Sequence, residues 1–314
     1  MINMGTYNLP PVGNTPMAKC DFYDLPVYIK FESYNPFGSM KDRAASNIIR
    51  RAFELGLINN ESTIIESSSG NFGIALAAVC RKYGLHFICV IDTNTNKTCE
   101  KMLSVYGAEI IKIEVPDIHG GYLVNRLIKV KEILTKRDNI YWINQYENLL
   151  NAESYHSLAD EILSKLHCPD YIFIPVSSGG TITGVSYRIK EVSPQTKVIA
   201  VDSEGSVIFG GSARKRYLPG VGSSIVPAIL INSKIDDVVM IEESDMIRQC
   251  RCFFDSTGLM IGGSSGACLC AINKYNKRRI FQQNSKIVTI FADRGERYID
   301  TIFNDNWCRN NNLI

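Results

Sequence analysis

A lysine ends a turn-forming stretch, NPFGSMK, in which Gly38 and Ser39 precede Lys41. The residues before this stretch are typical of a strand, and those after it are typical of a helix. A lysine in the first turn of a helix lies at the positive end of the helix dipole, and partial burial adds to this effect. Both effects lower the pKa of the amine and favour a nucleophile or a base at position 41. A solvated lysine beside Asp42 is the alternative interpretation.

Three further loops combine glycine with hydroxyl side chains ahead of an apolar helix. The loop ESSSGNFG, at 66–73, offers exposed N–H groups that could bind a carboxylate, although serine is also an ordinary N-cap residue. The loop VSSGGTITG, at 176–184, offers N–H and hydroxyl donors that suit a phosphate group. The last loop is IGGSSGA, at 261–267. Ligands of α/β proteins bind at such loops, outside the carboxyl ends of parallel strands.

The elements that must position these loops alternate between β-rich apolar runs and helical segments. This alternation predicts βαβ units and an α/β fold, and the number of strands favours two domains, each with a mainly parallel twisted sheet flanked by helices. The expected strands are 27–31, 63–66, 86–92, 109–114, 139–143, 171–176, 198–202, 237–241 and 286–292. The expected helices include 39–55, 71–83, 121–135 and 152–166. The tail after Trp307 is predicted to be frayed.

Composition excludes several classes of protein. The 314 residues include 34 Lys and Arg against 32 Asp and Glu, so no excess of charge points to nucleic acid or to a membrane surface. No run approaches the roughly 18 apolar residues that span a bilayer, and the N-terminus has no secretory signal pattern. A cytoplasmic location is therefore expected.

The ten cysteines are expected to be reduced, because most lie in apolar runs where a free thiol behaves as a small hydrophobe. Cys250 with Cys252, and Cys268 with Cys270, fall in helical segments. Residues two apart on a helix point to different sides, so neither pair is predicted to bind a metal ion.

Taken together, the four loops resemble those of fold-type II pyridoxal-phosphate enzymes, the cysteine synthase and cystathionine β-synthase family. The resemblance extends from VGNTPM near the start to DRGERYID near the end. It implies that Lys41 is the Schiff-base lysine and that the substrate carboxylate is bound by Ser68, Ser69, Gly70 and Asn71. The residues that it implies for cofactor binding are Lys41, Asn71, Ser177, Ser178, Gly179, Gly180, Thr181 and Ser264.

The resemblance also implies an organisation and a reaction. A smaller, mobile domain is expected at 42–147, a larger domain at 1–41 with 148–314, and a homodimer as the assembly. Ser264 would stand beside the pyridine nitrogen, where a neutral hydroxyl suits β-elimination better than a long-lived carbanion. In the implied reaction Lys41 removes the α-proton, a β-substituent leaves to give an enzyme-bound aminoacrylate, and a nucleophile adds.

The segments VPDIHGGYLVNRLIKV, EGSVIFG and LPGVGSS resemble the N-(2-amino-2-carboxyethyl)-L-glutamate synthases of siderophore biosynthesis. Those enzymes join O-phospho-L-serine to L-glutamate, and a partner dehydrogenase later releases 2,3-diaminopropionate. Arg126, Tyr146 and Ser177 are the matched positions, and each supplies donors that a phosphate leaving group requires. Gln145 matches the family's glutamine for the substrate carboxylate.

Other interpretations of these residues stay open. Arg126 could be a solvated arginine, Tyr146 a core aromatic residue and Gln145 a loop cap. The Gly179-Gly180 pair is more typical of cysteine synthases, so sulfide with O-phosphoserine or O-acetylserine is a second hypothesis. A catalytically silent binding partner is a third.

Two conspicuous features are predicted to have no catalytic role. His119 could be a general acid, but an ordinary loop residue is the favoured interpretation. The basic cluster ARKRY, at 213–217, could meet an acidic substrate, but a solvated loop is favoured.

Overall fold

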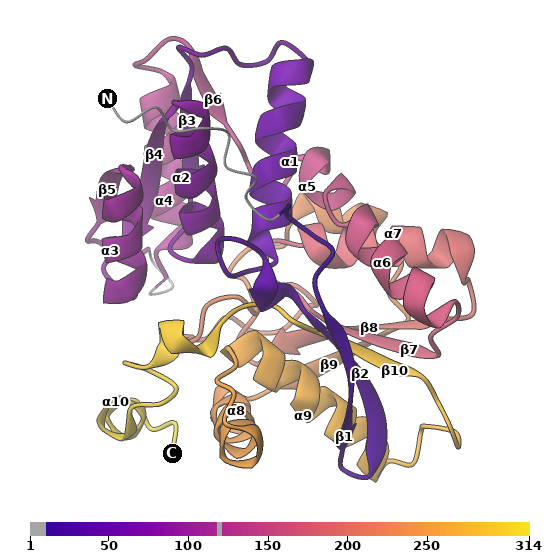
Figure 1. Cartoon of the computed structure of the whole chain (residues 1–314). Coiled ribbons are helices and arrows are strands. Elements are labelled where there is room, and N and C mark those ends of the chain that lie inside the picture. The colour runs from indigo at the N-terminus through magenta and orange to yellow at the C-terminus, as the bar shows by residue number, and fades with distance from the viewer. Residues whose placement is uncertain (1–10, 118–120) are drawn as a thin grey trace.

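The computed structural model describes residues 11–117 and 121–314, and it contains two sheets flanked by helices (Figure 1). The larger sheet has six strands in the order β1-β2-β10-β7-β8-β9, and the smaller has four in the order β5-β4-β3-β6. Every pairing is parallel except that between β1 and β2. The predicted α/β fold with two mainly parallel sheets is therefore confirmed.

The strands of the larger sheet are β1 (Met17–Phe22), β2 (Leu25–Phe31), β7 (Tyr171–Pro175), β8 (Lys197–Ser203), β9 (Asp237–Ile241) and β10 (Ile287–Phe291). Those of the smaller sheet are β3 (Thr63–Ser67), β4 (His86–Asp92), β5 (Glu109–Ile113) and β6 (Ile140–Trp142). The helices are α1 (Lys41–Glu54), α2 (Asn71–Tyr83), α3 (Lys97–Tyr106), α4 (Leu123–Leu134), α5 (Leu149–Glu153), α6 (His156–Leu166), α7 (Gly180–Val192), α8 (Glu243–Thr257), α9 (Gly263–Lys277) and α10 (Asp305–Asn310). Short 3-10 turns lie at Glu32–Tyr34, Ala228–Asn232 and Gly295–Tyr298.

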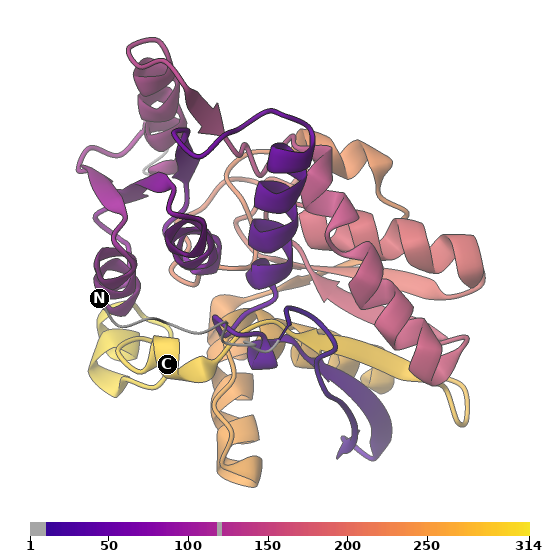
Figure 2. The ribbon, with the colours of Figure 1, turned by 45° about the horizontal axis from the view of Figure 1, so that its top comes forward.

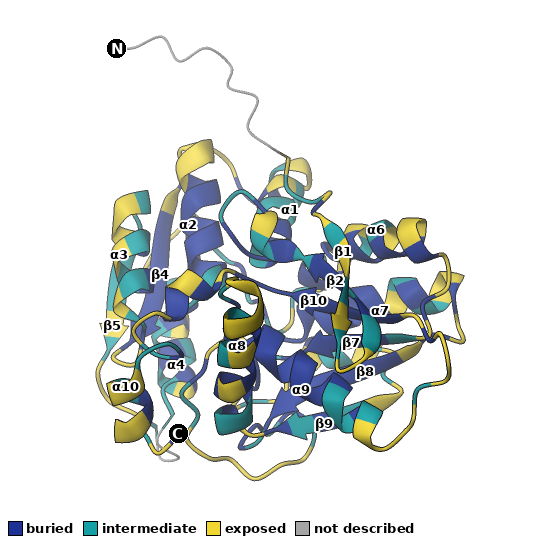
Figure 3. Ribbon diagram, turned by 60° about the horizontal axis from the view of Figure 1, so that its bottom comes forward, coloured by how far each residue is buried: buried dark blue, intermediate teal, exposed yellow. Residues whose placement is uncertain are grey.

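Alternate residues of β7 show how the larger sheet is covered. Ile172 and Ile174 belong to the core that contains α6 and α7, whereas Phe173 belongs to the core that contains α8 and α9. Successive side chains of a strand point to opposite faces, so an apolar run such as YIFIP is buried on both sides. Figure 3 shows α9 buried against the sheet, with α8 carrying exposed residues outside it.

The smaller sheet is covered in the same way, and α1 connects the two halves. Ile65, Ile88 and Val90 pack with α4, while Ile64 and Cys89 belong to the core shared with α2. Helix α1 packs against both α2 and α5, and Figure 2 shows it standing between the two groups of helices. The carboxyl ends of β3 and of β7 therefore lie on either side of the start of α1.

All strands of the smaller sheet lie within 63–142, and those of the larger sheet come from the segments before and after it. The domain boundaries at 41/42 and 147/148 stay a prediction. Among the described residues, no helix is both long enough and apolar enough to cross a membrane.

Two details of the chain before residue 170 differ from the prediction. The edge strand β1 was not expected, because MAKCDF is half polar and its turn, Tyr23-Asp24, adopts positive φ without glycine. The helix expected at 152–166 is two helices that begin at Leu149 and break near Ser154. The Ser154 hydroxyl donates to the Leu150 carbonyl oxygen at 2.5 Å, which is how serine competes with helical hydrogen bonding.

The expectation of a frayed tail after Trp307 is wrong. Residues Asp305–Asn310 form α10, and Cys308 and Leu313 are buried in the core beside α8 and α9. All ten cysteines are free, with Cys168 and Cys252 exposed and Cys20 half-buried.

Candidate active site

The turn before Lys41 is tied to the end of β10. The Met40 N–H donates to the Ala292 carbonyl at 2.8 Å, and Ser39 forms a bridge with Asp293. The buried carboxylate of Asp42 accepts a hydrogen bond from the Phe37 N–H at 2.6 Å and closes the turn. Helix α1 begins at Lys41, two residues later than the predicted start at Ser39, so Lys41 lies in the first turn, as predicted.

The amine of Lys41 lies beside the loop that follows β7. Its Nζ donates to the Ser178 hydroxyl at 3.5 Å, and burial lowers the pKa of Lys41 to about 8. Lys41 is half-buried and contacts Ser178, so the interpretation of a fully solvated lysine is wrong. A small hollow around this amine is lined by Met40, Lys41, Pro175, Ser177, Ser178, Gly179, Thr181, Ile182 and Gly220.

Backbone at the start of α7 forms the floor of this hollow. Gly179 has φ of +84°, which favours glycine, and a Cβ on Gly180 would lie 2.3 Å from Asn151 Oδ1. The first N–H groups of α7 have no partners within the helix, and the Ser178 and Thr181 hydroxyls add donors. Ser264 lies next to the hollow. Gly220 lines the hollow, and a Cβ atom added to Gly220 would be 3.9 Å from Ser264 Oγ.

The loop between β3 and α2 is held by side chains from the end of β10. The Ser68 hydroxyl accepts from the Gly73 N–H at 2.9 Å, while Ser69 and Gly70 remain half-buried. The Asn71 amide donates to Asp293 Oδ2 at 2.6 Å and accepts from an N–H of Arg297.

Asp293 and Arg297 were not identified as site residues from the sequence. Asp293 is buried, accepts from the Tyr298 hydroxyl at 2.5 Å, and has its pKa raised by burial. Its Oδ1 has no hydrogen-bond partner among the described residues and would lie 2.1 Å from a Cβ on Gly262. Asp293 comes two residues after the apolar strand IVTIF, and a charged residue at this place was the available signal, since strand ends carry ligand sites.

Arg126 lies at the carboxyl edge of the smaller sheet. It is 8% exposed, and its Nε is 3.3 Å from Asp92 Oδ2 in an ion pair. Neither Nε nor Nη1 has a hydrogen-bond partner within 11–117 and 121–314, although both atoms are buried. The interpretation of Arg126 as a solvated arginine is therefore wrong, and its donors are available for an anion.

Gln145 and Tyr146 follow β6 and lie near the same edge. Gln145 Nε2 donates to the Ser67 carbonyl at 3.1 Å and to Glu66 Oε1 at 3.4 Å. Burial raises the pKa of Glu66 to about 7 and that of Tyr146 to about 12, and the charge of Arg126 acts against both shifts. Gln145 is therefore held by hydrogen bonds to the last residues of β3.

The basic cluster at 213–217 is not uniformly solvated. Arg214 and Lys215 are exposed, but Arg216 is half-buried and its charge acts on Tyr146. The prediction of a solvated loop is wrong for Arg216. His119 lies outside the described residues.

The fold and the lysine-centred hollow are those of a pyridoxal-phosphate enzyme. A family model described as pyridoxal-phosphate dependent enzyme matches residues 9–293, and the chain belongs to this family. It is an enzyme of fold-type II, in the group related to cystathionine β-synthase that carries out β-substitution. The residues present fit the cofactor, because the Lys41 amine faces a hollow lined by Ser177, Ser178, Gly179 and Thr181, and the hydroxyl groups of this lining can bind a phosphate.

Solved structures of similar fold cover nearly the whole chain. An O-acetylserine dependent cystathionine beta-synthase from Helicobacter pylori is 31% identical, with a TM-score of 0.86 over 92% of this chain and 95% of that one. A hydrogen sulfide-producing enzyme from Fusobacterium nucleatum is 29% identical, with a TM-score of 0.85 over 91% and 97%. An O-ureido-L-serine synthase is 26% identical, with a TM-score of 0.84 over 93% of both chains.

Proposed function

We propose that this enzyme joins O-phospho-L-serine to L-glutamate, giving N-(2-amino-2-carboxyethyl)-L-glutamate and phosphate. One observation carries this proposal: the guanidinium of Arg126 is buried with its Nε 3.3 Å from Asp92 Oδ2, and its Nη1 has no hydrogen-bond partner among the described residues. An acetate leaving group has one carboxylate, whereas a phosphate has more charge and more acceptor oxygens to satisfy. A buried cation with unused donors suits the phosphate better.

The cofactor would be held by groups on both sides of the hollow. Lys41 would bind it covalently, Ser177, Ser178, Gly179, Gly180 and Thr181 would bind its phosphate, and Ser264 and Asn71 would contact its ring. Bound pyridoxal phosphate supplies an electron sink for the electron pair left at the α-carbon. The neutral hydroxyl of Ser264 suits a β-elimination followed by addition.

The substrate carboxylate would be bound by the N–H and hydroxyl groups of Ser68, Ser69, Gly70 and Asn71, with help from Gln145. Lys41 Nζ would accept the proton from the α-carbon, which its lowered pKa favours.

The Cβ–O bond then breaks, and Arg126, Tyr146 and Ser177 would bind the departing phosphate. The amino nitrogen of glutamate forms the new bond to Cβ and loses a proton, and Lys41 returns a proton to the α-carbon.

A cysteine synthase activity is the second candidate. The glycine pair at 179–180 favours it, and solved structures similar to this chain include an O-acetylserine dependent enzyme and a hydrogen sulfide-producing enzyme. Sulfide needs no recognition site of its own, whereas glutamate needs donors for two carboxylates.

A two-by-two substrate assay tests the proposal. The purified holoenzyme is given O-phospho-L-serine or O-acetyl-L-serine, each with L-glutamate or with sulfide. Phosphate release and product mass are measured. Phosphate release that requires L-glutamate, together with the mass of the glutamate adduct, is the expected result.

Two results would contradict the proposal. Formation of cysteine without any glutamate adduct would make the enzyme a cysteine synthase. Turnover of O-acetyl-L-serine without turnover of O-phospho-L-serine would remove the phosphate assignment of Arg126, Tyr146 and Ser177.

We further propose that the enzyme acts in the cytoplasm as a homodimer and that a dehydrogenase consumes its product to supply 2,3-diaminopropionate for a siderophore. Size measurement by light scattering tests the dimer. Release of 2,3-diaminopropionate from the purified adduct by a dehydrogenase tests the downstream step.

A further inference from the structure

Arg216 is the second arginine near the site with an unused, buried donor. It lies on the loop between β8 and the turn at 228–232. Its Nη1 donates to the Val221 carbonyl at 3.3 Å and its Nη2 to the Ser224 hydroxyl at 3.1 Å. Its Nε is buried without a hydrogen-bond partner among the described residues, and none of their carboxylates lies within 4.0 Å to form an ion pair.

The position of Arg216 connects it to the cofactor loop. A Cβ on Gly222 would lie 2.3 Å from Arg216 Nη1, so the guanidinium packs directly on this glycine. Gly222 in turn donates from its N–H to the Val176 carbonyl at 2.7 Å and accepts from the Ser177 hydroxyl at 3.1 Å. Arg216 is therefore separated from Ser177 only by the backbone of Gly222.

The 3-10 turn that follows this loop is hydrogen-bonded to Tyr146. The Ile229 N–H donates to the Tyr146 carbonyl at 3.1 Å, and the charges of Arg216 and Tyr146 act on each other. Arg216 therefore lies on a segment of the larger sheet that reaches Ser177 through Gly222 and Tyr146 through Ile229.

Other buried arginines near the site are already bonded. Arg43 binds Glu32 and Glu161, and Arg297 binds Asn71 and the Phe37 carbonyl. Of the arginines in the described parts of the chain, Arg126 and Arg216 are the two with a buried nitrogen atom lacking a partner.

A carboxylate suits Arg216 better than a phosphate does. Burial lowers the pKa of Arg216, and the nearby carboxylates of Asp202 and Glu243 act in the opposite direction. Asp202 is itself buried, with Oδ2 lacking a partner among the described residues. Nη1 and Nη2 of Arg216 are already hydrogen-bonded, so Nε is the buried donor that is left, and it suits the single charge of a carboxylate better than a phosphate dianion.

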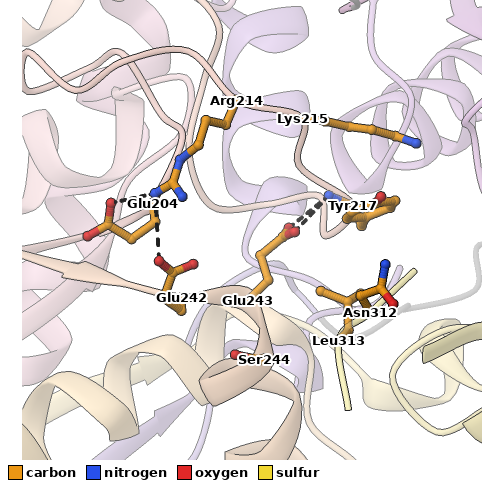
Figure 4. Close-up of a pocket in the computed structure, with 9 residues that line it drawn as sticks. All are labelled: Glu204, Arg214, Lys215, Tyr217, Glu242, Glu243, Ser244, Asn312 and Leu313. Atoms are coloured by element: carbon orange, nitrogen blue, oxygen red, sulfur yellow. Dashed lines mark hydrogen bonds and ion pairs between the residues drawn. The ribbon is translucent and has the colours of Figure 1, made fainter. Parts of the chain in front are cut away.

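Glu243 fixes the loop that carries Arg216. Its carboxylate accepts the N–H of Tyr217 at 2.8 Å and that of Leu218 at 2.6 Å, as Figure 4 shows for Tyr217. These bonds lie in a hollow of about 170 Å³ on the outer side of the loop. Arg214 lies on that outer side and pairs with Glu204 and Glu242, whereas Arg216 packs on Gly222 (Figure 4 shows Arg214).

We propose that Arg216 binds the side-chain carboxylate of the incoming amino dicarboxylate, while Arg126 binds the leaving phosphate. This inference rests on the proposed function, because it assigns a binding residue to the second substrate, L-glutamate. It makes Arg216 a specificity residue for an anionic nucleophile, in a site that would otherwise admit sulfide.

The test compares Arg216→Gln with Arg214→Gln, a matched control on the same loop. Steady-state kinetics are measured with L-glutamate and with L-glutamine, which has the same shape without the side-chain charge. Arg216→Gln is expected to raise KM for L-glutamate about 10- to 100-fold and to abolish the preference for glutamate over glutamine, since a charged hydrogen bond is lost. KM for O-phospho-L-serine and all constants of Arg214→Gln should change less than about threefold.

Calorimetric titration of L-glutamate into the holoenzyme gives a readout that is independent of turnover, and the same weakening is expected there. Arg216→Lys guards against misfolding of the glutamine variant. It keeps the charge, so it should keep a preference for glutamate with a raised KM.

The outcomes separate the inference from the proposed function. Wild-type enzyme that does not turn over glutamate would overturn both. Glutamate turnover with unchanged KM in Arg216→Gln would overturn the inference alone. A raised KM for O-phospho-L-serine only would place the leaving group, and not the nucleophile, at Arg216. Equal losses with glutamate and glutamine would leave Arg216 as a loop-positioning residue.

Discussion

The two sheet edges on either side of Lys41 differ in the types of residue that line them. In the loop after β7, at the edge of the larger sheet, glycine and hydroxyl groups surround Lys41, and the charged residues Asp293 and Arg297 lie farther along this edge, after β10. At the edge of the smaller sheet, Glu66, Asp92 and Arg126 are all buried. The loop after β7 relies on backbone and hydroxyl donors, and the smaller sheet on side-chain charge.

This difference suggests that the two edges have different functions. A phosphate cradle made of backbone N–H groups requires close approach of main chain, so it constrains glycine positions and changes little with the substrate. Buried charges are costly unless a ligand or a partner compensates them, so their arrangement discriminates between ligands. We therefore expect the larger sheet to determine the cofactor and the smaller sheet, together with Arg216, to determine the substrates.

Removing the amine of Lys41, which lies between the two edges, should have the largest effect on activity. Lys41→Ala is expected to lower kcat by about 10³-fold or more, because the covalent contact and the proton acceptor are lost together. Phosphate release from O-phospho-L-serine measures this effect. Unchanged thermal unfolding would show that the variant is folded, and retention of more than a tenth of the wild-type rate would contradict the role of Lys41.

Altering the charged edge should change substrate preference. Arg126→Gln is expected to lower kcat/KM for O-phospho-L-serine about 10- to 100-fold, because charge-assisted bonds to the phosphate are lost. Its effect on kcat/KM for O-acetyl-L-serine should be smaller. Equal losses of kcat/KM with both esters would mean that Arg126 supports the fold through its ion pair with Asp92 and does not bind the leaving group.

Altering the glycine loop after β7 should affect stability and cofactor affinity. Gly180→Ala would push a methyl group against Asn151, which is held by its bond to the Gln145 carbonyl at 2.7 Å. The expected cost is about 1–3 kcal/mol in the free energy of unfolding, with weaker binding of pyridoxal phosphate. Denaturant titration measures the cost. Gly70→Ala, whose Cβ would meet nothing within 4 Å, should cost less than about 1 kcal/mol.

The pH dependence of cofactor uptake gives a smaller effect. The pKa of Lys41 is lowered to about 8, so raising the pH through 8 converts the amine to its neutral, reactive form. Uptake of pyridoxal phosphate by the apoenzyme should rise about tenfold between pH 7 and pH 9 and then level off. A rate that keeps rising beyond pH 10 would indicate a solvated lysine.

Much of the fold follows from local patterns. Apolar runs such as HFICVID are buried on both faces, so they predict parallel strands without knowledge of their neighbours. The missed strand β1 and the break at Ser154 show where this fails. An edge strand needs only a partner to pair with, and Ser154 interrupts the helix through a side-chain bond that periodicity does not reveal.

The sequence alone determined the ordered glycine and serine loops and a lysine at the start of a helix, because turn geometry and helix initiation depend on neighbouring residues. Only the tertiary structure decided which charged residues matter. Arg126 is buried by contact with Asp92, and Arg216 packs on Gly222 behind Ser177, so a solvated cluster in the sequence becomes a buried donor. Burial arises from segments that are far apart along the chain, and a buried guanidinium nitrogen atom without a hydrogen-bond partner favours the binding of an anion.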